Sequence, residues 1–218
     1  MYNRVYGLME PPATYSEREW ILIGMAESCA SRGYEASTVS DVCTLAGVSE
    51  ASFEALFSGK EDCLVAALRS VLEEGYRRIA DIHSPQRPWA AVVRDGARVL
   101  LDLLAERPAF ARLVLLEVPA AGGPASAQYA AAKAALLSYV ERGRESAIEA
   151  DIPASAGRAA LAGAEALVVG KILAGGKLLA ELAAEVVYLL TVPYLGQEEA
   201  LRQAVDRSSP RSALRAVA

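Results

Sequence analysis

Histidine, cysteine and aromatic residues are scarce in this sequence of 218 residues, which has one histidine, three cysteines and 6% aromatic residues. Cys29, Cys43 and Cys63 follow no metal-ligand spacing, so the sequence predicts no metal site and no cofactor. An odd number of cysteines suits a reducing compartment. We interpret all three as small buried packing residues, with a redox-sensing thiol pair as the alternative.

Residue patterns typical of catalysis are also lacking. The single histidine, His83, lies in a proline-containing segment where exposure to solvent is expected. The sequence contains no nucleophile-elbow glycine pattern and no phosphate-binding glycine loop. The carboxylate pairs Glu73–Glu74 and Glu198–Glu199 are interpreted as solvated faces of helices. We therefore expect that the protein is not an enzyme.

Long apolar runs are missing as well. No run reaches 18 residues, because charged residues interrupt the longest candidate at Glu165, Lys171, Lys177, Glu181 and Glu185. The first residues, MYNRVYGLMEPP, lack the charged-then-apolar order of a signal peptide. We therefore expect no membrane span and a cytoplasmic location.

The composition favours helices. Apolar residues make up 53% of the sequence and are mainly Ala, Leu and Val, and no alternating strand pattern is visible. The length allows one large or two small domains with a buried core. We predict an all-α protein with a small N-terminal and a larger C-terminal helical domain.

The segment from Thr38 to Lys60, TVSDVCTLAGVSEASFEALFSGK, predicts two short helices joined by a tight turn. Thr38 and Asp41 form a capping box at the start of the first helix. Gly47 ends that helix, and Ser49 caps the second.

The second of these helices is amphipathic. Phe53, Leu56 and Phe57 give it one apolar face, and its exposed face consists of Glu50, Ala51, Ser52, Glu54 and Ala55. Two helices joined in this way form a helix-turn-helix, whose second helix enters the DNA major groove. The segment therefore indicates a DNA-binding regulator.

The charge of this region opposes that interpretation. The protein has a net charge of −5, and residues 1–60 contain four basic and eight acidic residues. Phosphate contacts supply much of the affinity for DNA. A dimer can still bind through helix N-termini, hydroxyls and a few cations. The alternative is a regulator-like fold that binds ligand or protein partners with weak or no DNA binding.

Further helices are predicted on both sides of this motif. One helix spans about 17–31, with Ser16 and Glu19 as its capping box. Another opens at Ser58, with Ser58 and Glu61 as a third capping box, and runs towards Ile82. A break at 83–88 follows. The remaining helices are expected at about 89–105, 108–118, 125–149, 153–174 and 177–192, the last ending near Pro193 and Gly196.

These elements predict three regions. Residues 1–60 form the helix-turn-helix domain, with a flexible arm at 1–14. Residues 61–205 form a ligand-binding and dimerisation domain, with its first helix as the connector. Residues 206–218 are expected to be a flexible tail.

Residues 16–64 together resemble the N-terminal domain of the tetracycline-repressor (TetR) family of bacterial transcription regulators. The features that match are Arg18, Ile21-Leu22, Gly33-Tyr34, Thr38-Val39, Ala46-Gly47-Val48-Ser49, Phe53, Phe57, Lys60-Glu61 and Leu64. The resemblance implies a homodimer that binds a palindromic double-stranded DNA operator and is released by a small-molecule effector. It also implies that Thr38, Ser49, Ser52 and Lys60 contact the DNA backbone.

Two positions differ from the family pattern. Glu54 stands where the family commonly has Tyr, and Leu56 where it often has His or Tyr. Glu54 thus replaces a side chain that donates a hydrogen bond to a DNA phosphate with one that carries the same negative charge as the phosphate. Glu50 adds a second carboxylate on the same face. A Glu can accept a hydrogen bond from cytosine N4, so we include Glu50, Ala51 and Glu54 among the DNA-binding residues.

A ligand cavity is expected among the helices that follow Lys60. The candidate lining residues are Trp89, Val93, Leu100, Phe110, Leu113, Tyr129, Leu136 and Glu165. Side chains of this type are also ordinary core residues. Tyr129 and Glu165 are the more specific candidates, because a buried hydroxyl or carboxylate needs a partner. Glu165 either faces the cavity or forms an ion pair with Lys133 or Lys171.

The helix at 153–174 is apolar on nearly all sides and must therefore be covered on all sides. The resemblance implies that this helix and the one at 177–193 form a four-helix dimer interface with a second subunit. Burial within the same subunit is the alternative for part of this surface. The sequence thus predicts a ligand-responsive transcriptional regulator, a repressor released by an apolar or amphipathic ligand.

Overall fold

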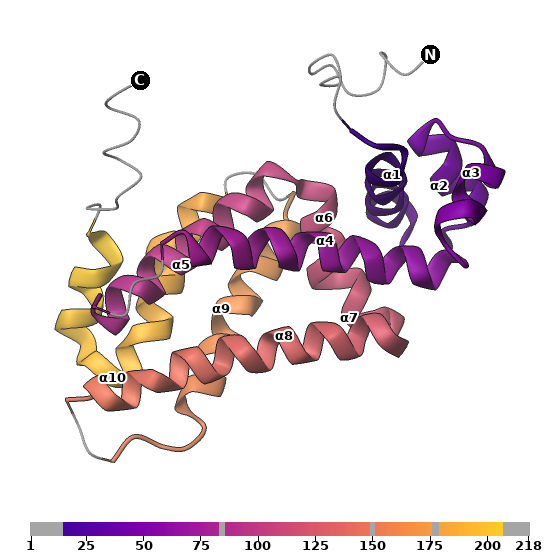
Figure 1. Cartoon of the computed structure of the whole chain (residues 1–218). Coiled ribbons are helices and arrows are strands. Elements are labelled where there is room, and N and C mark those ends of the chain that lie inside the picture. Colours follow the sequence, from indigo (N-terminus) through magenta and orange to yellow (C-terminus); the bar gives the residue numbers. More distant parts are fainter. Residues whose placement is uncertain (1–14, 83–85, 149–150, 176–178, 207–218) are drawn as a thin grey trace, which may run out of the picture.

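The computed structural model describes residues 15–82, 86–148, 151–175 and 179–206. Every regular element in these residues is a helix, which confirms the all-α prediction (Figure 1). The predicted arm at 1–14 and the tail after Asp206 lie outside the described residues, as does His83.

The N-terminal helices are α1 (Glu17–Arg32), α2 (Val39–Ala46), α3 (Glu50–Leu56) and α4 (Lys60–Ala80). Two of the predicted capping boxes are present. The Glu19 amide donates to Ser16 Oγ at 3.3 Å, and the Asp41 amide donates to Thr38 Oγ1 at 3.1 Å. The carboxylates of Glu19 and Asp41 accept from the backbone amides of Ser16 and Thr38 in return, so both helices begin where the sequence predicts.

The third predicted capping box, between Ser58 and Glu61, is wrong. Gly59 is the residue that caps α4, so the position three residues after the cap is Asp62. Asp62 Oδ2 accepts from the Ser58 amide at 3.0 Å and from the Ser58 hydroxyl at 3.2 Å. Ser58 therefore bonds Asp62 in place of the predicted Glu61, and the cap residue Gly59 makes no side-chain capping bond.

Helix α4 extends from the N-terminal helices into the larger body of the molecule (Figure 1). The body consists of α5 (Trp89–Glu106), α6 (Pro108–Arg112), a π-helical segment (Leu113–Glu117), α7 (Val118–Ala121), α8 (Gly123–Glu141), a 3-10 turn (Arg142–Ser146), α9 (Ala156–Leu173), a second 3-10 turn (Leu179–Leu182) and α10 (Ala183–Val205).

Two helix ends differ from the predictions. The helix expected over 125–149 ends at Glu141 and continues only as a 3-10 turn. The helix expected to end near Pro193 continues to Val205, with a kink at Gly196, where φ is 70°. Gly adopts this positive φ without a steric penalty, so the chain can turn there and resume the helix.

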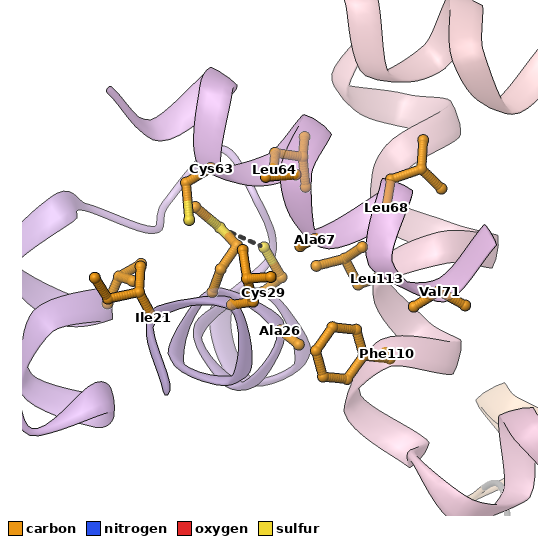
Figure 2. Close-up of a cluster of buried hydrophobic side chains, with 14 of the residues drawn as sticks. Ile21, Ala26, Cys29, Cys63, Leu64, Ala67, Leu68, Val71, Phe110 and Leu113 are labelled. Atoms are coloured by element: carbon orange, nitrogen blue, oxygen red, sulfur yellow. Dashed lines mark hydrogen bonds between the residues drawn. The ribbon is translucent and has the colours of Figure 1, made fainter. Parts of the chain in front are cut away.

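Buried side chains form two cores. The first joins α1–α4 to residues of the body, including Phe110 and Leu113, whose side chains point towards those of α1 and α4 in Figure 2. The second lies among α5, α8, α9 and α10 and is centred on residues such as Val187 and Tyr194. The first core therefore extends across position 60, where the sequence predicts the end of the first domain.

Within the described residues, the stretch Leu179–Val205 is long and apolar enough to cross a membrane, judged by length and composition alone. Here it contributes Val187, Leu190 and Tyr194 to the second core. Its kink at Gly196 interrupts the helix in the middle of the stretch.

Candidate functional site

Helix α3 presents a polar face to solvent. Ser49 caps the helix, and Phe53 and Phe57 hold its other side against the first core with ring centroids 5.4 Å apart. Glu50 and Glu54 are exposed, together with Ala51 and Ala55, while Ser52 is half-buried. The exposed face predicted for this helix is therefore available to a partner.

Leu56 was expected on the inner face, and this prediction is wrong because its side chain is 42% exposed. Helix α3 ends at Leu56, and Phe57 adopts an extended backbone with φ −141° and ψ 137°. That change of backbone turns the Phe57 ring into the core and leaves Leu56 outside.

The hydroxyls expected to contact the DNA backbone already make hydrogen bonds within the protein. The Thr38 hydroxyl donates to Asp41 Oδ2 at 2.7 Å. Ser49 Oγ accepts from the Ser52 amide at 3.0 Å and donates to the Ser52 hydroxyl at 3.0 Å. Ser52 Oγ accepts in this bond, so its own proton remains to donate outwards.

Lys60 is held at the turn between α1 and α2. Its ammonium donates to the carbonyl oxygens of Tyr34 at 2.9 Å and Glu35 at 3.3 Å, and it lies 4.3 Å from the centre of the Tyr34 ring. An ammonium has three protons, so one remains for a phosphate oxygen.

Other cations near α3 are engaged in contacts within the protein. The Arg32 guanidinium lies 3.0 Å from Asp41 Oδ1, and Arg18 lies over the Phe57 ring at 5.5 Å. Glu50 is at the N-terminus of α3, where the helix dipole favours a negative charge. The exposed surface of α3 is thus acidic.

The three cysteines are buried, which confirms their interpretation as packing residues. Cys29 Sγ lies 3.7 Å from Met25 Sδ in the first core (Figure 2). Burial raises the pKa of the Cys29 thiol to about 11 and raises the pKa values of Cys43 and Cys63 in the same direction. Neutral buried thiols are poor nucleophiles, so nothing in this cluster favours the redox alternative.

The predicted ligand-binding residues are divided between the two cores. Val93 is buried in the second core, and Phe110 and Leu113 are buried in the first. Trp89 lies beside the second core and donates its indole N–H to the Tyr139 carbonyl oxygen at 3.0 Å. Leu100 and Leu136 are half-buried.

Tyr129 and Glu165 do come together, across α8 and α9. The Tyr129 hydroxyl donates to Glu165, and Lys133 Nζ lies 2.5 Å from Glu165 Oε2. Burial, and then the hydrogen bond to Glu165, raise the pKa of Tyr129. Of the two interpretations of Glu165, the structure shows the ion pair with Lys133, while Lys171 lies 3.7 Å from Glu181.

Two surface grooves border the predicted ligand region. One, of about 360 Å³, lies between α4 and α8 and includes Tyr76 and Gln128. The other, of about 470 Å³, lies between α1, α4 and the α5–α6 corner and includes Leu22 and Phe110. Of the predicted ligand residues, Phe110 alone lines one of these two grooves.

One link between the body and the DNA-binding helices was not predicted. Glu117, at the end of the π-helical segment, accepts a hydrogen bond from the Tyr34 amide at 2.8 Å. Lys60 holds the carbonyl oxygen of the same residue. The turn before α2 is therefore fastened on one side by α4 and on the other by the body.

A buried charge network at the far end of the body was also missed. Arg94 and Asp95 are 4% and 1% exposed, with 3.1 Å between Arg94 Nε and Asp95 Oδ1. Arg94 Nη1 reaches Asp206 at 2.6 Å, and Arg87 Nη2 reaches Asp95 at 2.5 Å. The network fastens the end of α10 to α5.

The geometry defines a class of protein: a helix-turn-helix unit with an exposed second helix, attached to an all-helical body. Residues 21–68 match the family described as bacterial regulatory proteins, tetR family. The N-terminal part of the chain is thus similar to bacterial regulatory proteins of the tetR family, and the chain as a whole has the fold of solved structures of such regulators. Among curated proteins, none matches this sequence.

Several solved structures share this fold. The fatty acid degradation regulator FadR from Bacillus halodurans is 16% identical, with a TM-score of 0.68 over 83% of this chain and 97% of that one. FadR from Bacillus subtilis, solved in complex with stearoyl-CoA, is 19% identical. Its TM-score is 0.66, and the match covers 80% of this chain and 98% of that one. A TetR-family regulator from Marinobacter aquaeolei VT8 is 20% identical. Its TM-score is 0.64, and the match covers 82% of this chain and 95% of that one.

Proposed function

We propose that this protein is a cytoplasmic, ligand-responsive transcriptional repressor. It binds a palindromic DNA operator as a homodimer and is released by a small apolar or amphipathic molecule. The observation that carries the proposal is the outer face of α3, which Phe53 and Phe57 hold away from the interior and which is exposed.

Base contacts have a larger share of DNA recognition here than in a basic protein. Glu50 and Glu54 can accept hydrogen bonds from cytosine N4 in the major groove, and the Ser52 hydroxyl can donate to a phosphate. Lys60 adds one point charge. Because few cations face the DNA, non-specific binding is weak, and because few counterions are released its dependence on salt is shallow.

Dimerisation is supported by the outer surface of α9. Residues spaced three or four apart on this helix are exposed and apolar, namely Ala159, Ala162, Ala166, Gly170 and Leu173. Small residues let a second helix approach closely, and Leu173 is 64% exposed. Two recognition helices must also reach successive half-sites, about 34 Å apart, which requires two subunits.

An amphipathic ligand is supported by the body and by its structural neighbours. One neighbour holds stearoyl-CoA, a long acyl chain on a charged carrier. In this chain the two cores meet around Leu115, which packs against both, so α6 and the π-helical segment are placed to respond to a molecule bound in the body.

The test is a salt-titrated binding assay with the intact protein and DNA flanking its own gene. Nanomolar, sequence-dependent binding at low salt is expected, with scrambled DNA of the same length as the control. The absence of binding at every salt concentration would contradict the proposal.

The second candidate function is a regulator-like protein that binds ligand or protein partners without DNA. The acidic face of α3 and the internal bonds of Lys60 favour it. Ligand binding without any operator binding is the result that would select this alternative.

A further inference from the structure

Arg112 is a half-buried cation with one side-chain nitrogen that is left without a partner. It is the last residue of α6 and is followed directly by the π-helical segment. Its Nε is fully covered and has no hydrogen-bond partner among the residues that the structure describes. By contrast, the buried Arg94 is bonded to Asp95, Gln203 and Asp206.

A covered guanidinium nitrogen without an acceptor is unfavourable, because it has lost water and gained nothing in exchange. Native proteins satisfy nearly all such groups, and the exceptions are completed by a ligand, an ion or ordered water. The arrangement around Arg94 shows that this fold supplies acceptors where a guanidinium has only a structural role. Arg112 is therefore a candidate for a group that arrives from outside the chain.

The residues next to Arg112 in the chain are apolar. Ala111 is buried in the second core and Phe110 in the first. Leu115 and Leu116 follow one helical turn after Arg112, and both are partly buried against the second core. Residues one turn apart share a helix face, so Leu115 and Leu116 lie on the face of the helix that carries Arg112. A π-helical segment begins at the next residue, and such segments are frequent at functional sites.

We propose that Arg112 binds the anionic head group, a carboxylate or a phosphate, of an amphipathic effector whose apolar part packs near Leu115 and Leu116. This inference rests on the proposed function. A guanidinium presents paired donors that match both anions, and such charge-assisted bonds are the strong ones. The site also has a route to the DNA-binding helices, because Glu117, five residues further on, holds the Tyr34 amide at 2.8 Å.

The test compares probes that share a chain but differ in charge: dodecanoate, dodecyl phosphate and uncharged dodecanol, titrated calorimetrically into the intact protein. Loss of charge-assisted hydrogen bonds predicts that Arg112→Met weakens binding of the two anions by about 10- to 100-fold. Dodecanol should bind both proteins equally. Arg158→Met is the matched control, because Arg158 is exposed on α9, and it should bind all three probes like the unchanged protein.

Arg112→Lys keeps the positive charge but lacks the paired N–H donors of a guanidinium, so it should weaken anion binding less than Arg112→Met. The melting temperature of ligand-free Arg112→Met should equal or exceed that of the unchanged protein, because an unsatisfied group is removed. A clear decrease in both Arg112→Met and Arg112→Gln would assign Arg112 a structural role and overturn the proposal. The proposal would also be overturned if Arg112→Met bound the anions as tightly as the unchanged protein, or if the unchanged protein did not bind them.

None of these measurements contains DNA, so their outcome is independent of operator binding. If Arg112→Met weakens anion binding as expected while the unchanged protein binds no operator, the repressor proposal fails and the anion site stands. If the unchanged protein binds an operator but Arg112→Met binds the anions as tightly as the unchanged protein does, only the assignment of Arg112 fails.

Discussion

The hydrogen bond between Glu117 and the Tyr34 amide gives the sharpest prediction for coupling between the body and the DNA-binding helices. Its length is 2.8 Å and it is half-buried. A hydrogen bond to a charged group contributes about 1.5–3 kcal/mol, and partial exposure places this one near the lower end, about 1.5–2 kcal/mol. For a domain of this size, each kcal/mol shifts the melting temperature by about 2–4 °C, so Glu117→Ala should lower it by about 3–8 °C.

The replacement Glu117→Gln retains a neutral acceptor and should lose about half of that amount. Glu35→Ala is the control, because Glu35 is exposed in the same turn, and it should change stability by less than about 0.5 kcal/mol.

Calorimetry measures the stability, and amide hydrogen exchange at Tyr34 reports the bond directly. Exchange should be faster in Glu117→Ala than in the unchanged protein, because the amide has lost its acceptor. If Glu117→Ala left both the melting temperature and the Tyr34 exchange rate unchanged, the proposed link between the π-helical segment and the DNA-binding helices would be refuted.

Four further predictions concern other parts of the molecule. Glu54→Tyr should strengthen operator binding in a salt-titrated assay, because it removes a carboxylate near phosphate, and unchanged affinity would contradict that geometry. Ala166→Arg on α9 should give monomers in light scattering, whereas Ala134→Arg on the exposed side of α8 should not; dimers of both variants would exclude this interface. Asp95→Ala removes the carboxylate that pairs with Arg87 and one of the two that pair with the buried Arg94, and it should cost about 3 kcal/mol in urea unfolding; a loss below about 1 kcal/mol would show that the network is dispensable. Because the pKa of Cys29 is raised to about 11 in the folded protein, its contribution to stability is complete below pH 9 and lost as pH rises towards 11. Its alkylation at pH 8 should therefore require unfolding, and rapid reaction of the native thiol would count against its burial.

Short-range features of this fold could be predicted from the sequence because their partners are three or four residues apart. The boxes at Ser16 and Thr38 depend only on side chains that a helix start brings together, and both are present. The same rule failed at Ser58, because it requires knowing which residue is the cap. It is Gly59, so Asp62 replaces Glu61 as the partner. Leu56 was misplaced for a related reason, since its orientation depends on where α3 ends.

The sequence by itself determined the helical class, the helix-turn-helix and the polar outer face of α3, since helical periodicity and capping are local properties. Only the tertiary structure decided which charges meet. Glu117 binds the amide of Tyr34 across 83 positions, and Arg94 reaches Asp206 across 112. It also decided that Glu165 bonds Tyr129 and Lys133, whereas Arg112 Nε has no hydrogen-bond partner among the residues that the structure describes. Pairing of this kind depends on how helices pack, which no local pattern specifies.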